Sequence, residues 1–195
     1  EVAVLKSDDL FDWLSVMLDD TDINVRKAAS RCLTLTSPVF PSGVSSILAN
    51  ELRSTVRFRM DAAWAGLSGL CDTWPEVVVD HVDSLLLEDD MELRKKATAL
   101  LKKIVNKGDS AVWDLISWSL NDADVEVRRV AAKNLPALAR KESRIATLFA
   151  ERALSDSDSE VRLSAIKAVQ ALDTDHGRAR ELVVRGTTSK DLKVR

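Results

Sequence analysis

The sequence repeats with a period of 34 residues, and this repeat limits the possible folds more strongly than any other feature. An alanine recurs at this spacing in five copies, namely Ala29, Ala63, Ala97, Ala131 and Ala165. A leucine stands eleven residues before each of these alanines, namely Leu18, Leu52, Leu86, Leu120 and Leu154. A unit of this length cannot bury its own apolar face, so successive copies must stack on one another. The repeat therefore predicts an array of similar units.

Each copy contains two stripes of apolar residues at helical spacing. In the fourth copy the first stripe is Trp113, Ile116 and Leu120, and the second is Val127, Ala131, Leu135 and Leu138. The acidic segment NDAD separates the two stripes at residues 121–124. The pattern predicts two helices joined by a short turn in every copy, and an all-α protein. The repeated alanine fits a place where two helices cross closely, because a larger side chain would push their backbones apart.

An aspartate in the turn is predicted to cap each second helix. We call the residue four positions before the repeated alanine the anchor, and the anchors are Val25, Arg59, Leu93, Val127 and Val161. Asp22, Asp90, Asp124 and Asp158 stand three residues before an anchor, where a carboxylate can accept from the free amides of the first turn. The second copy has Val56 at this position and Met60 after its anchor. We expect that hairpin to be bent or repacked, with Met60 facing inward.

These turns and the residues after them resemble the HEAT repeat, particularly its short, PBS-lyase-like form. The matching elements are Asp22 with Val25-Arg26, Asp90 with Leu93-Arg94, Asp124 with Val127-Arg128, and Asp158 with Val161-Arg162. The tetratricopeptide repeat has the same period, but its Trp, Leu-Gly and Tyr signature is absent and the chain has no tyrosine. The resemblance implies a right-handed, armadillo-like α-solenoid of antiparallel helical hairpins. It also implies that the motif aspartates and the motif arginines form a hydrogen-bonded ladder between neighbouring hairpins, which gives a structural role to Arg26, Arg94, Arg128 and Arg162. The alternative is an arginine cluster that grips phosphate or carboxylate.

The repeat boundaries define one solenoid over residues 1–195. We expect hairpins at about 9–37, 41–71, 75–107, 109–141 and 142–173, and a truncated sixth hairpin at 175–195. The chain opens at Glu1, and its last five residues repeat the start of a second helix. We therefore expect it to be a fragment of a longer protein, with the rest of that chain as one of its partners.

Charge and cysteine content exclude several classes of protein. The chain has 28 Lys and Arg against 31 Asp and Glu, a net charge of −3, so it lacks the general positive field that favours nucleic acid. Cys32 and Cys71 lie far apart without a CxxC motif, which is typical of thiols in a reducing compartment. No apolar run reaches membrane-spanning length. We expect an intracellular, cytoplasmic protein that binds neither nucleic acid nor a membrane.

The sequence shows no motif for catalysis, a cofactor or a metal, and we predict a protein that is not an enzyme. A Gly-rich phosphate loop, an HExxH motif and an EF-hand loop are all absent. His81 and His176 lie in different copies without a third ligand at metal spacing. One alternative comes from the HEAT-like DNA glycosylases that excise alkylated bases, because Trp113, Asp114 and Trp118 resemble their groove residues. The acidic balance of the chain argues against that alternative.

Basic residues on the second helices are the candidate binding site. Second helices line the inner curve of HEAT solenoids, and the cations off the apolar stripe there are Lys27, Arg31, Lys95, Lys102, Arg129, Lys133 and Lys167. We expect this band to bind a protein partner with an acidic or mixed-charge segment, with Trp118 as a surface aromatic anchor. The alternatives are a solvated helix face with local ion pairs, or a passive spacer or sensor arm of a larger protein.

Overall fold

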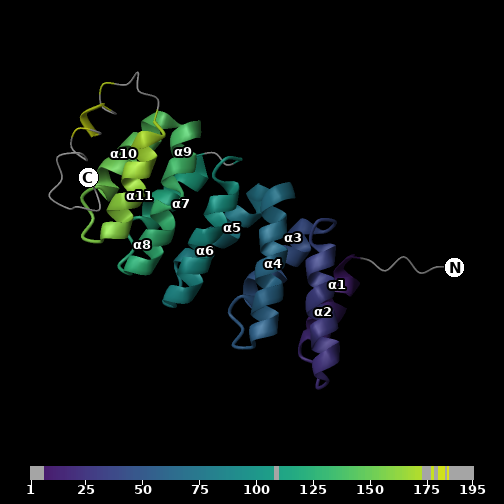
Figure 1. The fold of residues 1–195 in the computed structure, drawn as a ribbon. Helices are drawn as coiled ribbons and strands as arrows, with labels where there is room; N and C mark the ends of the chain where they lie inside the picture. Colours follow the sequence, from purple (N-terminus) through teal and green to yellow (C-terminus); the bar gives the residue numbers. More distant parts are fainter. Residues whose placement is uncertain (1–6, 108–109, 173–176, 178–179, 183, 185–195) are drawn as a thin grey trace. The chain divides into compact units, whose positions relative to one another are not determined.

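The computed structural model describes the backbone of residues 7–107, 110–172, 177, 180–182 and 184, and this part of the chain is helical without any strand (Figure 1). The helices are α1 (Ser7–Leu18), α2 (Ile23–Thr36), α3 (Pro41–Glu51), α4 (Arg57–Thr73), α5 (Pro75–Leu86), α6 (Met91–Ile104), α7 (Ser110–Ser119), α8 (Val125–Ala132), α9 (Leu135–Lys141), α10 (Ser143–Ala153) and α11 (Ser159–Gln170). The all-α prediction is confirmed. Most of the expected sixth hairpin lies outside the described residues, and the handedness of the solenoid remains a prediction.

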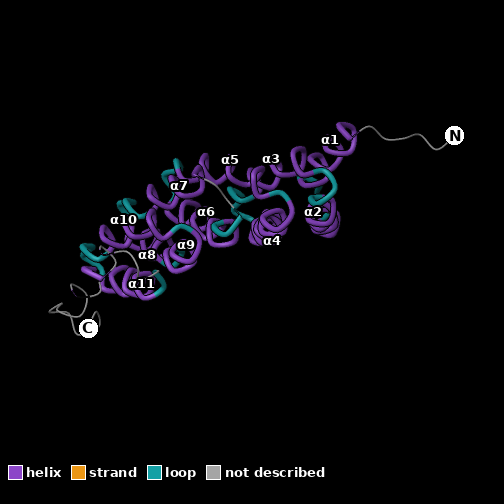
Figure 2. Tube along the Cα trace, turned by 90° about the horizontal axis from the view of Figure 1, so that it is seen from above, coloured by secondary structure: helices purple, strands orange, loops and turns teal. Residues whose placement is uncertain are grey.

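The chain divides into two compact units, unit 1 (Glu1–Leu85) and unit 2 (Leu86–Arg195). Within unit 1, α1, α3 and α5 lie in one layer and α2 and α4 in the other (Figure 2). Within unit 2, α7 and α10 lie in one layer, and α6, α8, α9 and α11 in the other (Figure 2). In each unit separately, we call these the first-helix layer and the second-helix layer, because they hold the first and second helices of the hairpins.

The repeated alanines lie where the second helices pack. Each of the five is at most 3% exposed, and α2 packs on α4 and α6 on α8. The sequence prediction for these positions is confirmed. In unit 1, a Cβ built on Gly66 of α4 would lie 2.7 Å from Leu48 Cδ1 of α3, so a larger residue there would displace the Leu48 side chain. Small residues on second helices therefore set how tightly the hairpins stack.

The turn aspartates cap the second helices as predicted. The Asp22 and Asp90 carboxylates accept from backbone N–H groups two residues later at 2.8 Å, and Asp124 does so at 2.7 Å. Asp158 accepts from the N–H groups of both Glu160 and Val161, at 3.0 and 3.1 Å. Val56 occupies the same position before α4 and gives no side-chain cap. The helix α4 runs uninterrupted from Arg57 to Thr73 with Met60 partly buried, and whether this hairpin is bent or repacked stays a prediction.

The second helix of the fourth copy is broken into α8 and α9, whereas its apolar stripe predicts one continuous helix. Pro136 lacks an N–H group and its ring would clash with the carbonyl of Ala132, so one continuous helix cannot form. The apolar stripe nevertheless survives, since Val127, Ala131, Leu135 and Leu138 are all fully buried. Asn134 lies at the break, also fully buried, and its side-chain oxygen has no hydrogen-bond partner. The break therefore redirects the backbone without exposing the core.

Candidate interaction surface

Arg94 links two successive hairpins of unit 2. Its Nη1 donates to the carbonyl oxygens of Glu88 and Asp89 in its own turn, at 2.9 and 2.8 Å. Its Nε and Nη2 donate to the Asp122 carboxylate of the next turn, at 2.8 and 3.2 Å. The ion pair with Asp122 raises the pKa of Arg94.

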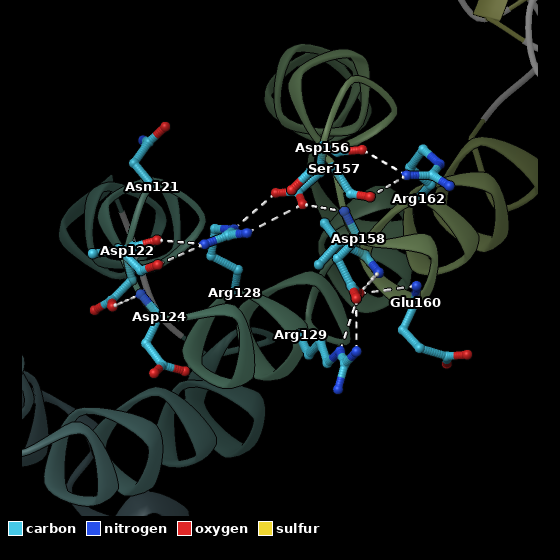
Figure 3. A network of polar contacts seen from close by, with 12 residues as sticks. Asn121, Asp122, Asp124, Arg128, Arg129, Asp156, Ser157, Asp158, Glu160 and Arg162 are labelled. Carbon is cyan, nitrogen blue, oxygen red and sulfur yellow. Dashed lines mark hydrogen bonds and ion pairs between the residues drawn. The ribbon is translucent and has the colours of Figure 1, made fainter.

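Arg128 repeats this arrangement one hairpin later (Figure 3). Its Nη1 donates to the carbonyl oxygens of Asp122 and Ala123, at 2.9 and 3.0 Å. Its Nε and Nη2 donate to the Asp156 carboxylate, at 2.9 and 3.4 Å. Both carboxylates and both guanidinium groups are largely buried. A ladder of the kind that the resemblance implies thus exists for Arg94 and Arg128, whose role is structural. Its carboxylates are Asp122 and Asp156, and not the motif aspartates Asp124 and Asp158, which cap the next helices.

Arg26 and Arg162 make the same contacts to their own turns. Arg26 Nη1 donates to the Asp20 carbonyl oxygen at 2.6 Å, and Arg162 Nη1 donates to those of Asp156 and Ser157 at 2.8 Å. Ser54 stands where the turn after Arg26 would need a carboxylate. The ladder therefore continues in unit 2 but loses its carboxylate in the second copy.

Arg59 provides a different link in unit 1. Its guanidinium donates to the largely buried Glu51 carboxylate, with Nη2 at 2.6 Å, and to Asp19 of the preceding turn, with Nη1 at 2.9 Å. The hydrogen bonds to Glu51 raise the pKa of Arg59 well above its ordinary value. Sequence reasoning missed this network. The available signal was an arginine at an anchor position that is apolar in the other copies.

Arg129 is also engaged within the protein (Figure 3). Its Nε and Nη2 donate to the two oxygens of Asp158, at 3.0 and 2.6 Å, and its Nη1 donates to Glu126 at 2.6 Å. The Arg129 guanidinium lowers the pKa of Asp158 to about 2, and the N–H groups that Asp158 caps act in the same direction. Arg129, which we predicted as a partner-binding residue, already has two carboxylate partners.

The other predicted basic residues differ in how far their charges are neutralised. Lys95 Nζ donates to Glu92 at 2.6 Å, and Lys27 Nζ lies 5.9 Å from the centre of the Phe58 ring. Arg31 is exposed on α2 of unit 1. Three further residues are exposed and form no ion pair within the described part of the chain, namely Lys102, Lys133 and Lys167. We call these three residues, which belong to successive second helices, the lysine band.

The tryptophans Trp74, Trp113 and Trp118 lie in different places in the structure. Trp118 is 50% exposed, but it lies on α7 in the first-helix layer and not beside the lysine band. Trp74 is 40% exposed, and its indole N–H donates to the Pro38 carbonyl oxygen at 3.1 Å. Trp113 is partly buried in the apolar stripe, with a fully buried indole nitrogen. Trp113 and Trp118 therefore differ in exposure and do not form one open aromatic groove.

The described residues contain no group of three side chains that could hold a metal ion. His81 is partly buried, and its Nε2 lies 2.9 Å from the Ser45 hydroxyl of α3. Burial lowers the pKa of His81. Ser45 is itself 1% exposed and donates to the Ser42 carbonyl oxygen, so this pair joins α5 to α3. None of the helices in the described ranges is long and apolar enough to cross a membrane.

No protein-family profile and no curated protein matches the sequence, but solved structures match the fold. An engineered protein is 21% identical, with a TM-score of 0.55 over 94% of this chain and 91% of that chain. A computationally designed armadillo repeat protein for modular peptide recognition is 16% identical, with a TM-score of 0.53 over 94% of each chain. A chain of the Pds5–Scc1 complex is 12% identical, with a TM-score of 0.60 over 91% of this chain and 32% of its own length. At these identities the likeness establishes the fold, an α-solenoid of the armadillo and HEAT kind, and nothing further.

Proposed function

We propose that this chain is a non-catalytic protein-interaction scaffold that binds an acidic segment of a partner protein along its second-helix layer. Repeat proteins of this architecture offer a row of similar helix surfaces, and an extended partner can contact several of them at once. Two of the solved structures with this fold are described by their binding, one to Scc1 and one to peptides. Those descriptions support the class of function without identifying a partner.

The observation that carries the proposal is the contrast between arginines and lysines in unit 2. Arg94, Arg128 and Arg129 are each held by a carboxylate from the next turn. The lysine band is exposed and has no such neutralising partner among the described residues. Lys133 and Lys167 stand at the same position of consecutive copies, six residues after the anchor. Unneutralised cations repeated along one layer favour approach of a negatively charged segment.

The remaining candidate residues have narrower roles in this proposal. Lys95 and Arg129 lie on the same helices as the lysine band, but their carboxylate partners reduce what they can add to binding. Lys27 and Arg31 offer a similar charge on α2 of unit 1. Trp118 belongs to the other layer, so we assign it no role at this surface.

A peptide-display selection tests the proposal without a known partner. Peptides enriched on the wild-type chain should contain more Asp and Glu than the starting library. They should bind less well when the lysine band is neutralised by Lys102→Gln, Lys133→Gln and Lys167→Gln. We expect a loss of about fivefold in affinity, because each exposed ion pair contributes a few tenths of a kcal/mol. Circular dichroism should be unchanged, since exposed charges add little to stability.

A control variant separates a specific surface from an effect of net charge. Ser15→Glu, Ser46→Glu and Asn50→Asp together make the same change of three charges on exposed positions of α1 and α3. Asn50→Asp also retains the acceptor for Arg53. Equal weakening by both variants would contradict a specific surface. A selection with no enrichment of acidic peptides would favour a passive spacer, and tighter binding of duplex DNA than of any peptide would favour the glycosylase-like alternative.

A further inference from the structure

We propose that unit 1 carries a docking surface for an apolar segment of a partner protein that also bears lysine or arginine. We call it the apolar loop surface, because it lies at the last turn of α2 and in the two loops that join successive hairpins. It consists of Leu35, Pro38, Val39, Phe40 and Trp74. It shares no residue with the lysine band of unit 2, and it does not depend on the function proposed above.

The first of these loops exposes a row of apolar side chains. Leu35 is 77% exposed and Val39 is 69% exposed, and Phe40 is exposed as well. The N–H groups of Val39 and Phe40 both donate to the Thr36 carbonyl oxygen at 3.0 Å, so a helical turn continues beyond the end of α2. Val39 therefore follows Leu35 by about one turn, on the same side of the chain.

The second loop lies beside the first. The Trp74 indole N–H donates to the Pro38 carbonyl oxygen at 3.1 Å, although the two residues are 36 positions apart in the sequence. Both residues remain exposed. Exposed apolar residues that are scattered singly need no explanation, but a group of neighbouring ones is typical of an interaction site. The five residues of the apolar loop surface form such a group.

The backbone of these loops does not require aromatic residues. Phe40 and Trp74 both stand fifteen residues after an anchor, with φ of −127° and −138° and ψ of 63° and 61°. Glu142 stands at the same position in unit 2 and has nearly the same conformation, with φ of −136° and ψ of 74°. Packing explains part of each aromatic side chain, since Phe40 contacts Phe11 edge to face and Trp74 bonds to Pro38. The exposed remainder of both rings is available to a partner.

The charge of unit 1 indicates which kind of segment fits. Unit 1 has 7 Lys and Arg against 13 Asp and Glu, a net charge of −6, and this count includes Arg31 of α2. Exposed acids also stand beside the aromatic residues in the sequence, because Asp12 follows Phe11 and Glu76 comes two residues after Trp74. A negative field attracts a segment with cations and repels nucleic acids and anionic membranes. A partner segment that alternates apolar residues with Lys or Arg matches both the apolar loop surface and this charge.

Fluorescence anisotropy of a labelled peptide of alternating Leu and Lys, about ten residues long, tests the apolar loop surface on the full chain. A peptide of Ser and Lys keeps the charge without the apolar side chains, and a peptide of Leu and Glu reverses the charge. The surface variant carries Leu35→Gln and Val39→Gln, which replace two exposed side chains. We expect the Leu–Lys peptide to bind the wild-type chain more tightly than the other two peptides do. The surface variant should bind it about tenfold more weakly, because apolar anchors carry most of the affinity of such an interface.

A matched variant and a direct map of the binding site complete the test. Leu87→Gln and Leu148→Gln remove two leucines of unit 2 that are 61% and 54% exposed, and should leave binding unchanged. Amide NMR of the wild-type chain needs no substitution, and the peptide should shift signals of residues 35–40 and 74.

Weakening by the surface variant alone, with shifts at those residues, supports the apolar loop surface. Equal weakening by both variants, equal binding of the Ser–Lys peptide, shifts confined to other residues, or tighter binding of an anionic vesicle overturns it. Self-association of the wild-type chain that the surface variant abolishes would make a second copy the occupant and would also overturn a separate partner. Circular dichroism of each variant confirms that any loss does not come from unfolding.

Discussion

The arginine after each anchor illustrates why residue type matters more than charge at these positions. Arg94 uses one nitrogen for two turn carbonyls and the other edge of its guanidinium for Asp122. A lysine carries its donors on a single nitrogen and cannot hold two such partners on different sides. Arginine therefore stabilises its own turn and the next hairpin at the same time.

Asp158 also has two roles, and a substitution can separate them. Asp158→Asn keeps a good capping side chain on α11 but removes the charge that pairs with Arg129. We expect a loss of about 1 kcal/mol in the free energy of unfolding at neutral pH, because the pair is partly exposed to solvent. Urea unfolding of the two proteins measures this difference.

The loss of stability that Asp158→Asn causes should become smaller at low pH. The pKa of Asp158 falls from its ordinary 3.8 to about 2, so its stabilising charge is fully present above pH 3.8 and is lost as the pH falls toward 2. The difference in the free energy of unfolding between wild type and variant should shrink as the pH falls from 3.8 toward 2. Asp124→Asn is the matched control, since Asp124 caps α8 without an arginine partner in the described structure. Equal costs for the two substitutions, or a difference that does not change with pH, would contradict the assignment.

Among the helices, α4 is the one whose start departs most from the repeat. Val56 gives its first turn no side-chain cap, and Ser54 replaces the turn acid that would meet Arg26. The link through Arg59, Glu51 and Asp19 replaces the missing ladder contact by a different geometry. In unit 1 the ion pair between the first two hairpins thus comes from one arginine that reaches two carboxylates.

Restoring the missing cap should stabilise unit 1. Val56 is 38% exposed, so Val56→Asp gives up part of a partly covered apolar side chain but supplies an acceptor for the first turn of α4. We expect a gain of about 1 kcal/mol in the free energy of unfolding, measured by urea denaturation. Val56→Glu adds the same charge with a poorer capping geometry and is the control. A gain of equal size from both substitutions would show that charge near the helix start, and not capping, causes the effect.

The sequence predicted the elements whose causes are local. The buried alanines and the aspartate caps follow from helical spacing and short-range hydrogen bonds, and both are confirmed. The break before α9 comes from Pro136, but the apolar stripe continues across it and predicts one helix, because periodicity alone does not reveal the break. The pairing of Arg129 with Asp158 joins residues 29 positions apart and depends on how hairpins stack, so spacing within one copy could not reveal it. The same limit applies to the candidate site, because exposure of a lysine depends on which carboxylates the stacking brings near it.

Charge is distributed unevenly along the whole chain. Unit 1 has 7 Lys and Arg against 13 Asp and Glu, a net charge of −6, whereas unit 2 has 21 against 18, a net charge of +3. Stability in a repeat protein is close to a sum over hairpins and over contacts between neighbours. The ion pairs between hairpins differ too. Those of unit 2 are made by Arg94, Arg128 and Arg129, and that of unit 1 is made by Arg59. Repulsion between its excess negative charges and the smaller number of ion pairs between its hairpins both lower the expected stability of unit 1.

We therefore expect the helices of unit 1 to open before those of unit 2. Hydrogen exchange in increasing urea should show amides of α2 and α4 exchanging at lower urea than amides of α8 and α11, because local opening follows local stability. Salt provides the control, since on the order of 1 M salt reduces the Debye length to about 3 Å and screens exposed charges. It should slow exchange in unit 1 by relieving repulsion and leave the largely buried pairs of Arg94 and Arg128 almost unchanged. Simultaneous exchange of both units at every salt concentration would mean that the chain unfolds as one cooperative body, in spite of its uneven charge.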